Sequence, residues 1–189
     1  MTSDFPTIPA GLARQIRLVI FDVDGVMTDG GVYVGAPDRG EPVELKRFDI
    51  QDGIGLKMLG WAGLEVVVVS GRESRATSIR IAELGIDGCY QVAGARKLHV
   101  VEGLLHERGI AWDEVAMIGD DIPDLAVMRR VGLKAVVANA TAPLASIATW
   151  QSRKIGGHGA VREFCDALLS ARGDLDRIVE AYVTERSTP

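Results

Sequence analysis

Two aspartates, Asp22 and Asp24, stand at the end of a short apolar run near the start of the chain. The run, residues 18–21, reads Leu-Val-Ile-Phe and is typical of a strand that is buried on both faces. If the extended geometry continues, side chains two residues apart point to the same side. Two carboxylates held so close repel each other unless a cation or a shared proton lies between them. Mg²⁺ suits such a pair, because it prefers carboxylate oxygen and keeps positions for water and phosphate.

The same pattern has two simpler interpretations. A strand that runs into an acidic turn is common, so Asp-x-Asp-Gly can be a plain turn. A calcium-binding EF-hand loop needs glycine at its sixth position and glutamate at its twelfth. Counted from Asp22, those positions hold Met27 and Tyr33, so the EF-hand interpretation fails. The interpretation as a plain turn remains possible until partners for the two aspartates are found.

Partners of the right kind follow a later apolar run. Asp120 and Asp121 come soon after residues 114–118, and we expect them to complete a metal site with Asp22. In that arrangement Asp22 is the natural nucleophile, since a carboxylate can attack phosphorus to form an aspartyl-phosphate. Asp24 could protonate the leaving oxygen and then activate water. The competing interpretation of Gly-Asp-Asp is an acidic cap on the following helix, above all for Asp121.

Two further side chains could bind a phosphate. Ser70 ends an apolar run and precedes Gly71, so its hydroxyl and the nearby backbone N–H groups could hold a phosphate oxygen. Ser70 could equally be the N-cap of a helix over residues 74–84. Lys97 opens a predicted helix and could neutralise both the nucleophile and the phosphate, although an exposed surface lysine is the alternative.

These side chains need a scaffold that brings the ends of distant strands together. Apolar runs alternate regularly with helical patterns, which predicts βαβ crossovers and a Rossmann-like α/β fold, a mainly parallel sheet with helices on both faces. Strands are predicted at 17–23, 64–69, 88–92, 114–118 and 133–138, and helices at 53–62, 74–84, 97–108, 123–130, 141–147, 160–171 and 174–184. A β-hairpin is predicted over about 31–46, around a Gly/Pro-rich turn. Ligand-binding and catalytic residues of parallel sheets usually lie at the carboxyl ends of the strands, so Asp22, Ser70 and Asp120 are expected to lie close together there.

Composition limits the class of protein. The 189 residues fit a single domain, and their 47% hydrophobic and 25% charged residues are close to the globular average. The net charge of −5 does not indicate a basic surface for binding nucleic acid. An acidic substrate would therefore need local positive charge or a metal in the site. Cys89 and Cys165 stand in apolar surroundings and are expected to be buried free thiols, as in a cytoplasmic protein. Residues 1–14 show neither a signal peptide nor a membrane span, and no membrane partner is expected.

Taken together, these residues resemble the haloacid dehalogenase superfamily of phosphotransferases. Its most specific motif here is the run Asp22-Val23-Asp24-Gly25-Val26-Met27-Thr28-Asp29-Gly30, and the later motifs are matched by Ser70, Lys97 and Gly119-Asp120-Asp121. Within the superfamily, residues 14–172 are similar to the 3-deoxy-D-manno-octulosonate 8-phosphate (KDO 8-phosphate) phosphatases. The similar segments are Asp29-Gly30, the hairpin, 48–53, 70–72, 118–124 and the glycine-rich 156–163. By this resemblance Mg²⁺ is held by Asp22, the backbone carbonyl of Asp24, and Asp120, while Ser70 and Lys97 bind phosphate.

The resemblance implies a Mg²⁺-dependent phosphatase of a small sugar-acid phosphate, which converts KDO 8-phosphate to KDO and phosphate through an aspartyl-phosphate. Asp22 is then the nucleophile and Asp24 the acid and base. The expected substrate-binding residues are Thr28, Asp49, Gly71, Arg72 and His158. Three positions depart from the family's pattern: Arg96 where Asp or Asn is usual, Asp49 where Asn is usual, and His158 in place of Arg. The last two lie where the family contacts the sugar, so they bear on which sugar is bound.

The chain has no room for the cap domain that covers many active sites of this superfamily. The interval from Asp29 to Ser70 holds only the hairpin and one helix, and that from Ser70 to Lys97 one helix and one strand. A lone hairpin is marginal in water and exposes pairing edges. The resembling family joins its hairpin flaps in a homotetramer, with the C-terminal tail, here about 155–189, reaching a neighbour's site. An open site for a macromolecular substrate, such as a phosphoprotein, is the alternative.

Other functions stay open on the sequence alone. One is a phosphatase of a related nonulosonate phosphate, of the sialic acid or KDN 9-phosphate type. A second is a receiver-like signalling domain, which the acidic pair following Ser70 and Lys97 disfavours. A third is a non-catalytic interaction module of a sugar-nucleotide pathway, which the intact set of Asp22, Asp24, Ser70, Lys97 and Asp120 disfavours.

Overall fold

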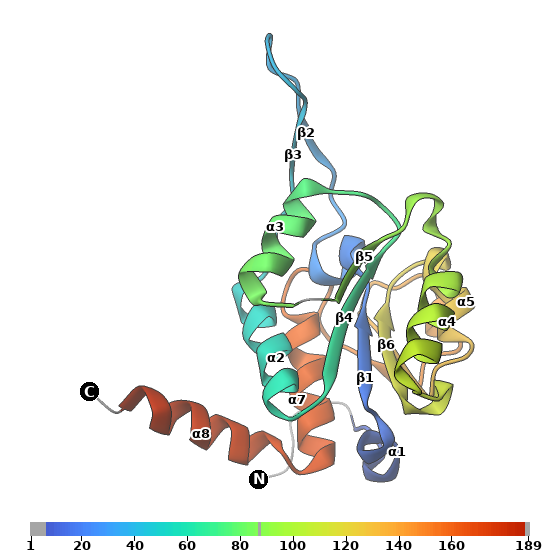
Figure 1. The fold of residues 1–189 in the computed structure, drawn as a ribbon, viewed down its shortest axis with the longest axis vertical. Coiled ribbons are helices and arrows are strands. Elements are labelled where there is room, and N and C mark those ends of the chain that lie inside the picture. The colour runs from blue at the N-terminus through green and yellow to red at the C-terminus, as the bar shows by residue number, and fades with distance from the viewer. Residues whose placement is uncertain (1–6, 87, 188–189) are drawn as a thin grey trace.

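A parallel β-sheet between two layers of helices forms the body of the protein in the computed structural model, which describes residues 7–86 and 88–187 (Figure 1). Within these ranges the sheet has the order β5-β4-β1-β6-β7-β8, and every neighbouring pair is parallel. The strands are β1 (Leu18–Phe21), β4 (Glu65–Ser70), β5 (Gly88–Gln91), β6 (Val115–Gly119), β7 (Leu133–Val136) and β8 (Trp150–Gln151). The predicted Rossmann-like α/β fold is therefore confirmed.

Strand β1 lies at the centre of the sheet because all four of its side chains are apolar and buried. Successive side chains point to opposite faces, so Val19 and Phe21 enter one core and Leu18 and Ile20 the other. The chain adds strands first on the β4 side of β1 and then on the β6 side. In doubly wound sheets, ligands bind where the strand order reverses in this way, at the carboxyl ends of the strands.

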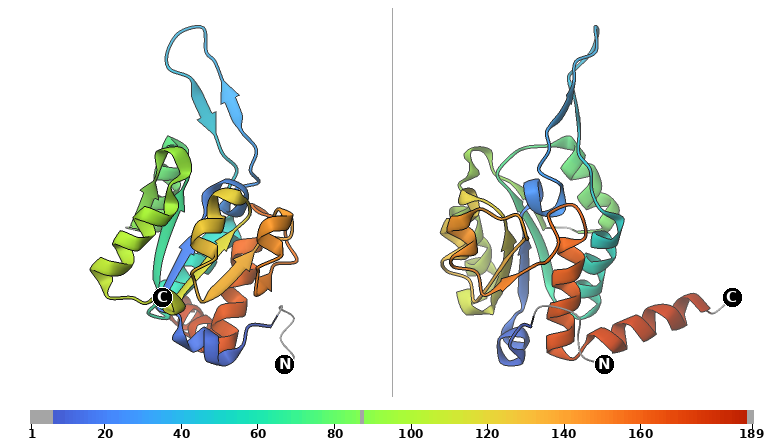
Figure 2. Two further views of the ribbon diagram at one scale, coloured as in Figure 1. Left: turned by 90° about the vertical axis from the view of Figure 1, so that its right-hand side faces the viewer. Right: turned by 180° about the vertical axis from the view of Figure 1, so that it is seen from behind.

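Helices cover both faces of the sheet (Figures 1 and 2). One face carries α1 (Ala10–Gln15), α2 (Ile50–Trp61), α3 (Arg75–Leu84) and α7 (Ala160–Arg172), and the other carries α4 (Lys97–Arg108), α5 (Leu125–Met128) and α6 (Ala142–Ala145). The ring of Phe164 on α7 lies 6.2 Å from that of Phe21. Helix α7 therefore belongs to the core, and within the described residues 155–187 only α8 (Leu175–Ser187) projects from the body (Figure 2).

The predicted hairpin is present and projects far from the sheet (Figure 1). Strands β2 (Tyr33–Gly35) and β3 (Val43–Leu45) are antiparallel, with Val34 opposite Glu44. Its exposed apolar side chains are Val32, Tyr33, Val34, Val43 and Leu45. No cap domain occurs between β1 and α4 in the part of the chain that the structure describes.

Several boundaries differ from the predictions for local physical reasons. β1 ends at Phe21 rather than at residue 23, because a tight helical turn, Val23–Met27, follows with Gly25 at φ +94°. Helix α2 begins at Ile50 rather than 53, since the Asp49 carboxylate caps it by accepting a hydrogen bond from the Gln51 N–H at 2.8 Å. Strand β8 was not predicted, because two residues give no periodic signal.

Two shorter corrections concern the lengths of two helices and the burial of the cysteines. The helices predicted at 123–130 and 141–147 are shorter, with α5 preceded by a separate 3-10 turn, Ile122–Asp124. Both cysteines are free thiols, but only Cys165 is buried, because Cys89 lies on the edge strand β5 and is half-buried. Among the described residues, no helix combines the length and apolar character needed to cross a membrane.

Asp52 is a buried carboxylate at the contact between α2 and α7. Its Oδ1 accepts a hydrogen bond from the Arg162 N–H at 2.8 Å, and its Oδ2 has no hydrogen-bond partner among the described residues. Burial is the main reason why the pKa of Asp52 is raised to about 6. A carboxyl with a raised folded-state pKa favours folding below its unfolded pKa and loses that contribution as pH rises through the folded value.

We therefore expect Asp52→Asn to stabilise the protein at pH 8 by up to about 3 kcal/mol, the free energy of a shift from 3.8 to about 6. At pH 4.5 the carboxyl of the folded wild type is mostly protonated, and the gain should fall to about a third of its value at pH 8. Urea unfolding at both pH values measures this difference. Asp38→Asn, at an exposed carboxylate of the hairpin loop, is the matched control. Equal stabilisation at both pH values would show that the charge of Asp52 is not the cause.

Candidate active site

An open pocket of about 310 Å³ lies at the carboxyl ends of β1, β4 and β6. Each of these strands ends in or is followed by polar residues, and the topology of the sheet brings the three ends together. The charged residues that line the pocket are Asp22, Asp24, Arg72, Lys97, Asp120, Asp121 and Asp124. Five acids and two bases in one pocket indicate a site for a cation together with an anionic substrate.

Lys97 bridges two of these acids at the floor of the pocket. Its Nζ donates to Asp22 Oδ1 at 2.5 Å and to Asp124 Oδ1 at 2.6 Å. The Lys97 side chain is 3% exposed, so the alternative of a solvated surface lysine is wrong. Burial alone would lower the pKa of Lys97, but the two carboxylates outweigh it and raise the pKa. Lys97 is therefore a fixed positive charge beside the predicted nucleophile.

Three carboxylates lie close together beside this one ammonium group. Single oxygens of Asp22, Asp120 and Asp124 all lie within 4.8 Å of one another. Burial and then the neighbouring charge of Asp124 raise the pKa of Asp22 well above its usual value, and the same two causes raise that of Asp120 to about 7. When ionised, three carboxylates carry more negative charge than the one ammonium group of Lys97 balances. An all-oxygen donor set with excess negative charge fits Mg²⁺.

Glycine at position 25 allows Asp120 to enter this cluster. A Cβ atom at Gly25 would lie 2.1 Å from Asp120 Oδ2, and the φ of +94° also disfavours any other residue. The glycine-rich segment supports the same loop from the other side. A Cβ at Gly156 would lie 1.7 Å from the Gly25 carbonyl oxygen, and the Gly157 N–H donates to Val26 O at 3.0 Å. Backbone packs directly on backbone here, which fixes the loop that carries Asp22 and Asp24.

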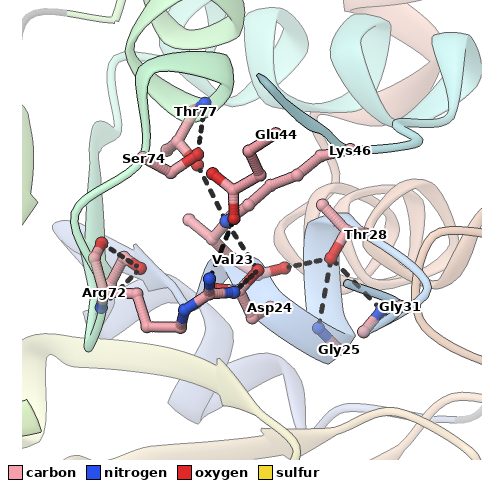
Figure 3. Close-up of polar contacts among 12 residues, drawn as sticks. Val23, Asp24, Gly25, Thr28, Gly31, Glu44, Lys46, Arg72, Ser74 and Thr77 are labelled. Atoms are coloured by element: carbon pink, nitrogen blue, oxygen red, sulfur yellow. Dashed lines mark hydrogen bonds and ion pairs between the residues drawn. The ribbon is translucent and has the colours of Figure 1, made fainter. Parts of the chain in front are cut away.

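Asp24 is held from the hairpin side of the pocket (Figure 3). Lys46, the residue after β3, donates to Asp24 Oδ1 at 2.6 Å. Arg72 lies close by, with its Nη1 3.9 Å from the same oxygen and its Nη2 2.9 Å from Glu44 Oε1. Asp22 and Asp24 thus line one pocket but have different cationic partners.

Ser70 and Ser74 have different functions at the end of β4. The Ser70 hydroxyl donates to Arg72 O at 3.1 Å and accepts from Arg72 N–H at 3.2 Å, which holds the turn that presents Gly71 and Arg72 to the pocket. Ser74, not Ser70, is the N-cap of α3, because its Oγ accepts from the Thr77 N–H at 3.3 Å. The predicted contact of Ser70 with phosphate stays a prediction.

Comparison with known proteins identifies the family of this site. Residues 91–164 match the family described as haloacid dehalogenase-like hydrolases. The chain is 44% identical over 164 residues to the 3-deoxy-D-manno-octulosonate 8-phosphate phosphatase KdsC of Escherichia coli K12, covering 87% of this chain and 85% of that protein. The chain belongs to the KDO 8-phosphate phosphatase family.

Solved structures of family members have the same fold. The KDO 8-phosphate phosphatase of Moraxella catarrhalis, in complex with magnesium ion, phosphate ion and KDO, has a TM-score of 0.84 and 34% identity, covering 92% of this chain and 97% of that chain. The cobalt-bound enzyme of Haemophilus influenzae has a TM-score of 0.79 and 35% identity, covering 87% of this chain and 93% of that chain.

Not all residues predicted to contact substrate lie in the pocket of this family member. The Thr28 hydroxyl is buried and bonds to backbone groups of its own loop, Val23 O, Gly25 N–H and Gly30 N–H. Asp49 caps α2, as described above. His158 is exposed in the glycine-rich segment, and its charge contributes to the lowered pKa of Asp29, whose first cause is the hydrogen bond from Tyr33. Contact of Thr28, Asp49 or His158 with a substrate therefore stays a prediction.

Two residues of this family member's site were missed in the sequence. Asp124 is buried and joins the carboxylate cluster, whereas Asp121 is exposed and caps the 3-10 turn by accepting from the Ile122 N–H at 2.8 Å. The acidic-cap interpretation therefore describes Asp121. Asp124 could have been noticed as a further acid four residues after Asp120. No sequence pattern indicated Lys46 as a site residue, since its position depends on the direction that the hairpin takes.

A larger hollow of about 450 Å³ lies at the opposite, amino-terminal edge of the sheet. Its lining includes Leu56, Lys57, Trp61, Glu65 and Arg108. Among the described residues that line it, Glu65 is the only carboxylate, so these residues do not form the acidic cluster that a phosphatase of this family needs.

Proposed function

We propose that this protein is a Mg²⁺-dependent phosphomonoesterase that hydrolyses KDO 8-phosphate to KDO and inorganic phosphate. The observation that carries the proposal is the buried Asp22 carboxylate, paired with Lys97 inside the carboxylate cluster where the strand order reverses. Relatives named for this activity, and a relative's complex with magnesium, phosphate and KDO, support the same substrate. No observation favours the nonulosonate, receiver or interaction-module alternatives.

The reaction would proceed in two steps on this chain's own residues. A carboxylate oxygen of Asp22 attacks phosphorus, the bond from phosphorus to the sugar oxygen breaks, and Asp24 gives its proton to that leaving oxygen. Asp24 then takes a proton from water as the water oxygen attacks the aspartyl-phosphate, which releases phosphate and restores Asp22. Lys97 orients Asp22 throughout and offsets the charge of the phosphoryl group.

Mg²⁺ would be held by Asp22, Asp120 and the backbone carbonyl of Asp24, with Asp124 beside them. When bound, the ion would offset the negative charge that gathers as the phosphoryl group transfers. Arg72 stands at the pocket mouth with a half-exposed side chain, and we assign it to the sugar carboxylate.

A panel of phosphate esters tests the substrate. With Mg²⁺ present, kcat/KM for KDO 8-phosphate should exceed that for sialic acid 9-phosphate, glucose 6-phosphate and an aryl phosphate by roughly 100-fold, because only a complementary sugar fills the pocket. A higher kcat/KM for any other ester would overturn the assignment. Arg72→Lys should reduce the preference by raising KM for the sugar acid more than for the aryl phosphate.

We further propose a cytoplasmic homotetramer assembled through the hairpin. The exposed Val34 and Leu45 side chains, 68% and 64% accessible, are the kind of apolar surface that subunit contacts cover. Light scattering of the wild-type protein at micromolar concentration should give four times the chain mass. Val34→Lys should give a smaller species, whereas Asp38→Asn in the same hairpin should not. A wild-type monomer would remove the hairpin contact from the proposal.

A further inference from the structure

The base of the hairpin reaches the active site through two charged side chains. Glu44 and Lys46 are two residues apart and point inward (Figure 3). The side chains of Val43 and Leu45, in contrast, are exposed. Successive residues of extended chain face opposite sides, so β3 and the residue after it present apolar groups to solvent and charged groups to the pocket.

Lys46 is the more firmly held of the two. Its side chain is 1% exposed, and its Nζ donates to Asp24 Oδ1 at 2.6 Å and to Thr77 Oγ1 at 3.3 Å. A buried ammonium group is costly unless it is paired and hydrogen-bonded, so this geometry is strongly preferred once the hairpin base is in place. The α3 residue Thr77 thus anchors Lys46, and Lys46 anchors Asp24.

Glu44 makes a parallel contact on the same side of the pocket. Its carboxylate accepts from Arg72 Nη2 at 2.9 Å, and this positions the guanidinium so that Nη1 is 3.9 Å from Asp24 Oδ1. Both cations therefore approach the same oxygen of Asp24, and Oδ2 is left for the substrate. Proton transfer needs a donor within about 2.6–3.2 Å of the reacting oxygen, a tolerance that a freely rotating carboxylate does not meet.

We infer that Lys46 is a positioning residue for the acid and base Asp24, held by the hairpin strand and by Thr77. The inference rests on the proposed function, because it assigns Lys46 to the proton transfers of that reaction. Lys46 does not touch the reacting atoms. It fixes the rotamer of Asp24, so its loss should slow the chemical steps without weakening the binding of substrate or metal.

The first test is Lys46→Met, which keeps most of the length of the side chain and removes the charge. Turnover of KDO 8-phosphate and of an aryl phosphate should show kcat lower by about 10–100-fold, with KM and the Mg²⁺ concentration for half-maximal activity changed less than about twofold. Lys46→Arg should recover most of the loss, since guanidinium can still hold one carboxylate oxygen. Lys57→Met, an exposed lysine at the opposite hollow, should leave both constants unchanged.

A double-mutant cycle shows whether Lys46 acts through Asp24. Asp24→Asn alone should reduce kcat by about 100-fold or more. Adding Lys46→Met to Asp24→Asn should lower kcat no further than about twofold, because there is no acid and base left to position. The inference would be overturned if the kcat losses of the two single variants multiplied in the double variant. It would also be overturned if Lys46→Met raised KM at unchanged kcat, or if its kinetics equalled those of the wild type.

Two further measurements keep the test decisive. If Lys46→Met melts below the assay temperature, Thr77→Val removes only the second anchor and should lower kcat by about threefold at constant KM. An unchanged kcat in Thr77→Val would then overturn the inference. A wild-type protein that hydrolyses the aryl phosphate but not KDO 8-phosphate contradicts the substrate assignment alone, and the cycle is then read on the aryl phosphate. A wild-type protein inactive on both esters overturns both proposals.

Discussion

Asp22→Asn is expected to lower phosphatase turnover by at least about 10⁴-fold while the protein still folds. The amide matches the carboxylate in shape but cannot attack phosphorus. Folding should not suffer, because burial and the charge of Asp124 raise the pKa of Asp22 and so disfavour its charged form. Lys97 keeps Asp124 as a partner at 2.6 Å in the variant.

The measurement is kcat in metal-replete samples, together with a melting curve at pH 7.5. The melting temperature should equal or exceed that of the wild type, and mass spectrometry should show that the introduced amide is intact. Asp113→Asn, at an exposed carboxylate before β6, is the control that should keep full activity. Activity above about 1% of wild type in the intact variant would contradict covalent catalysis by Asp22.

Lys97→Met is expected to reduce both stability and activity by a large amount. Removing one partner of a buried ion pair leaves unpaired charge and costs about 3–5 kcal/mol. Here the variant would leave Asp22, Asp120 and Asp124 without the ammonium that now contacts two of them. Activity should fall by about 10³-fold, since the charge of the phosphoryl group would no longer be offset from that side.

The loss of stability should depend on pH and on metal. The pKa of Asp120 is already about 7, and without Lys97 the pKa values of the cluster should rise further. Carboxyls with raised folded-state pKa values stabilise the fold at low pH and lose that contribution as pH rises. Urea unfolding in EDTA should therefore show a small deficit at pH 5 and the full deficit at pH 8, with partial recovery in Mg²⁺. A variant as stable as wild type at pH 8 in EDTA would refute this account.

The sequence was sufficient for the parts of the site that follow strands directly. The apolar residues of β1 allowed burial on both faces to be predicted, and the acids after β1 and β6 were therefore expected to meet. The site residues that were not predicted reach the pocket through contacts that form only after the chain has turned. Asp124 reaches the cluster only because the 3-10 turn, Ile122–Asp124, brings it back under Asp120, whose N–H donates to Asp124 Oδ2 at 3.2 Å.

Capping residues caused the other differences. Serine and aspartate near a helix start can cap it or contact a ligand, and the sequence pattern is the same for both. Ser74 rather than Ser70 caps α3, and Asp49 and Asp121 each accept a hydrogen bond from a helical N–H. The position of Lys46 could not be read at all, because the direction of a hairpin relative to a sheet is set by tertiary contacts.

The contact of the glycine-rich segment with the Asp22 loop has a consequence for how the chain folds during synthesis. Arg47 donates to the Gly157 carbonyl across 110 positions of sequence, whereas the strands that pair with β1, β4 and β6, both precede that segment in the sequence. Contacts between distant residues form late, because a long loop must close before they can. A nascent chain that has emerged only as far as α5 already contains every acid of the cluster and Lys97. It still lacks the backbone that packs on Gly25, so the enzyme should become active only after the glycine-rich segment, 156–163, has also emerged.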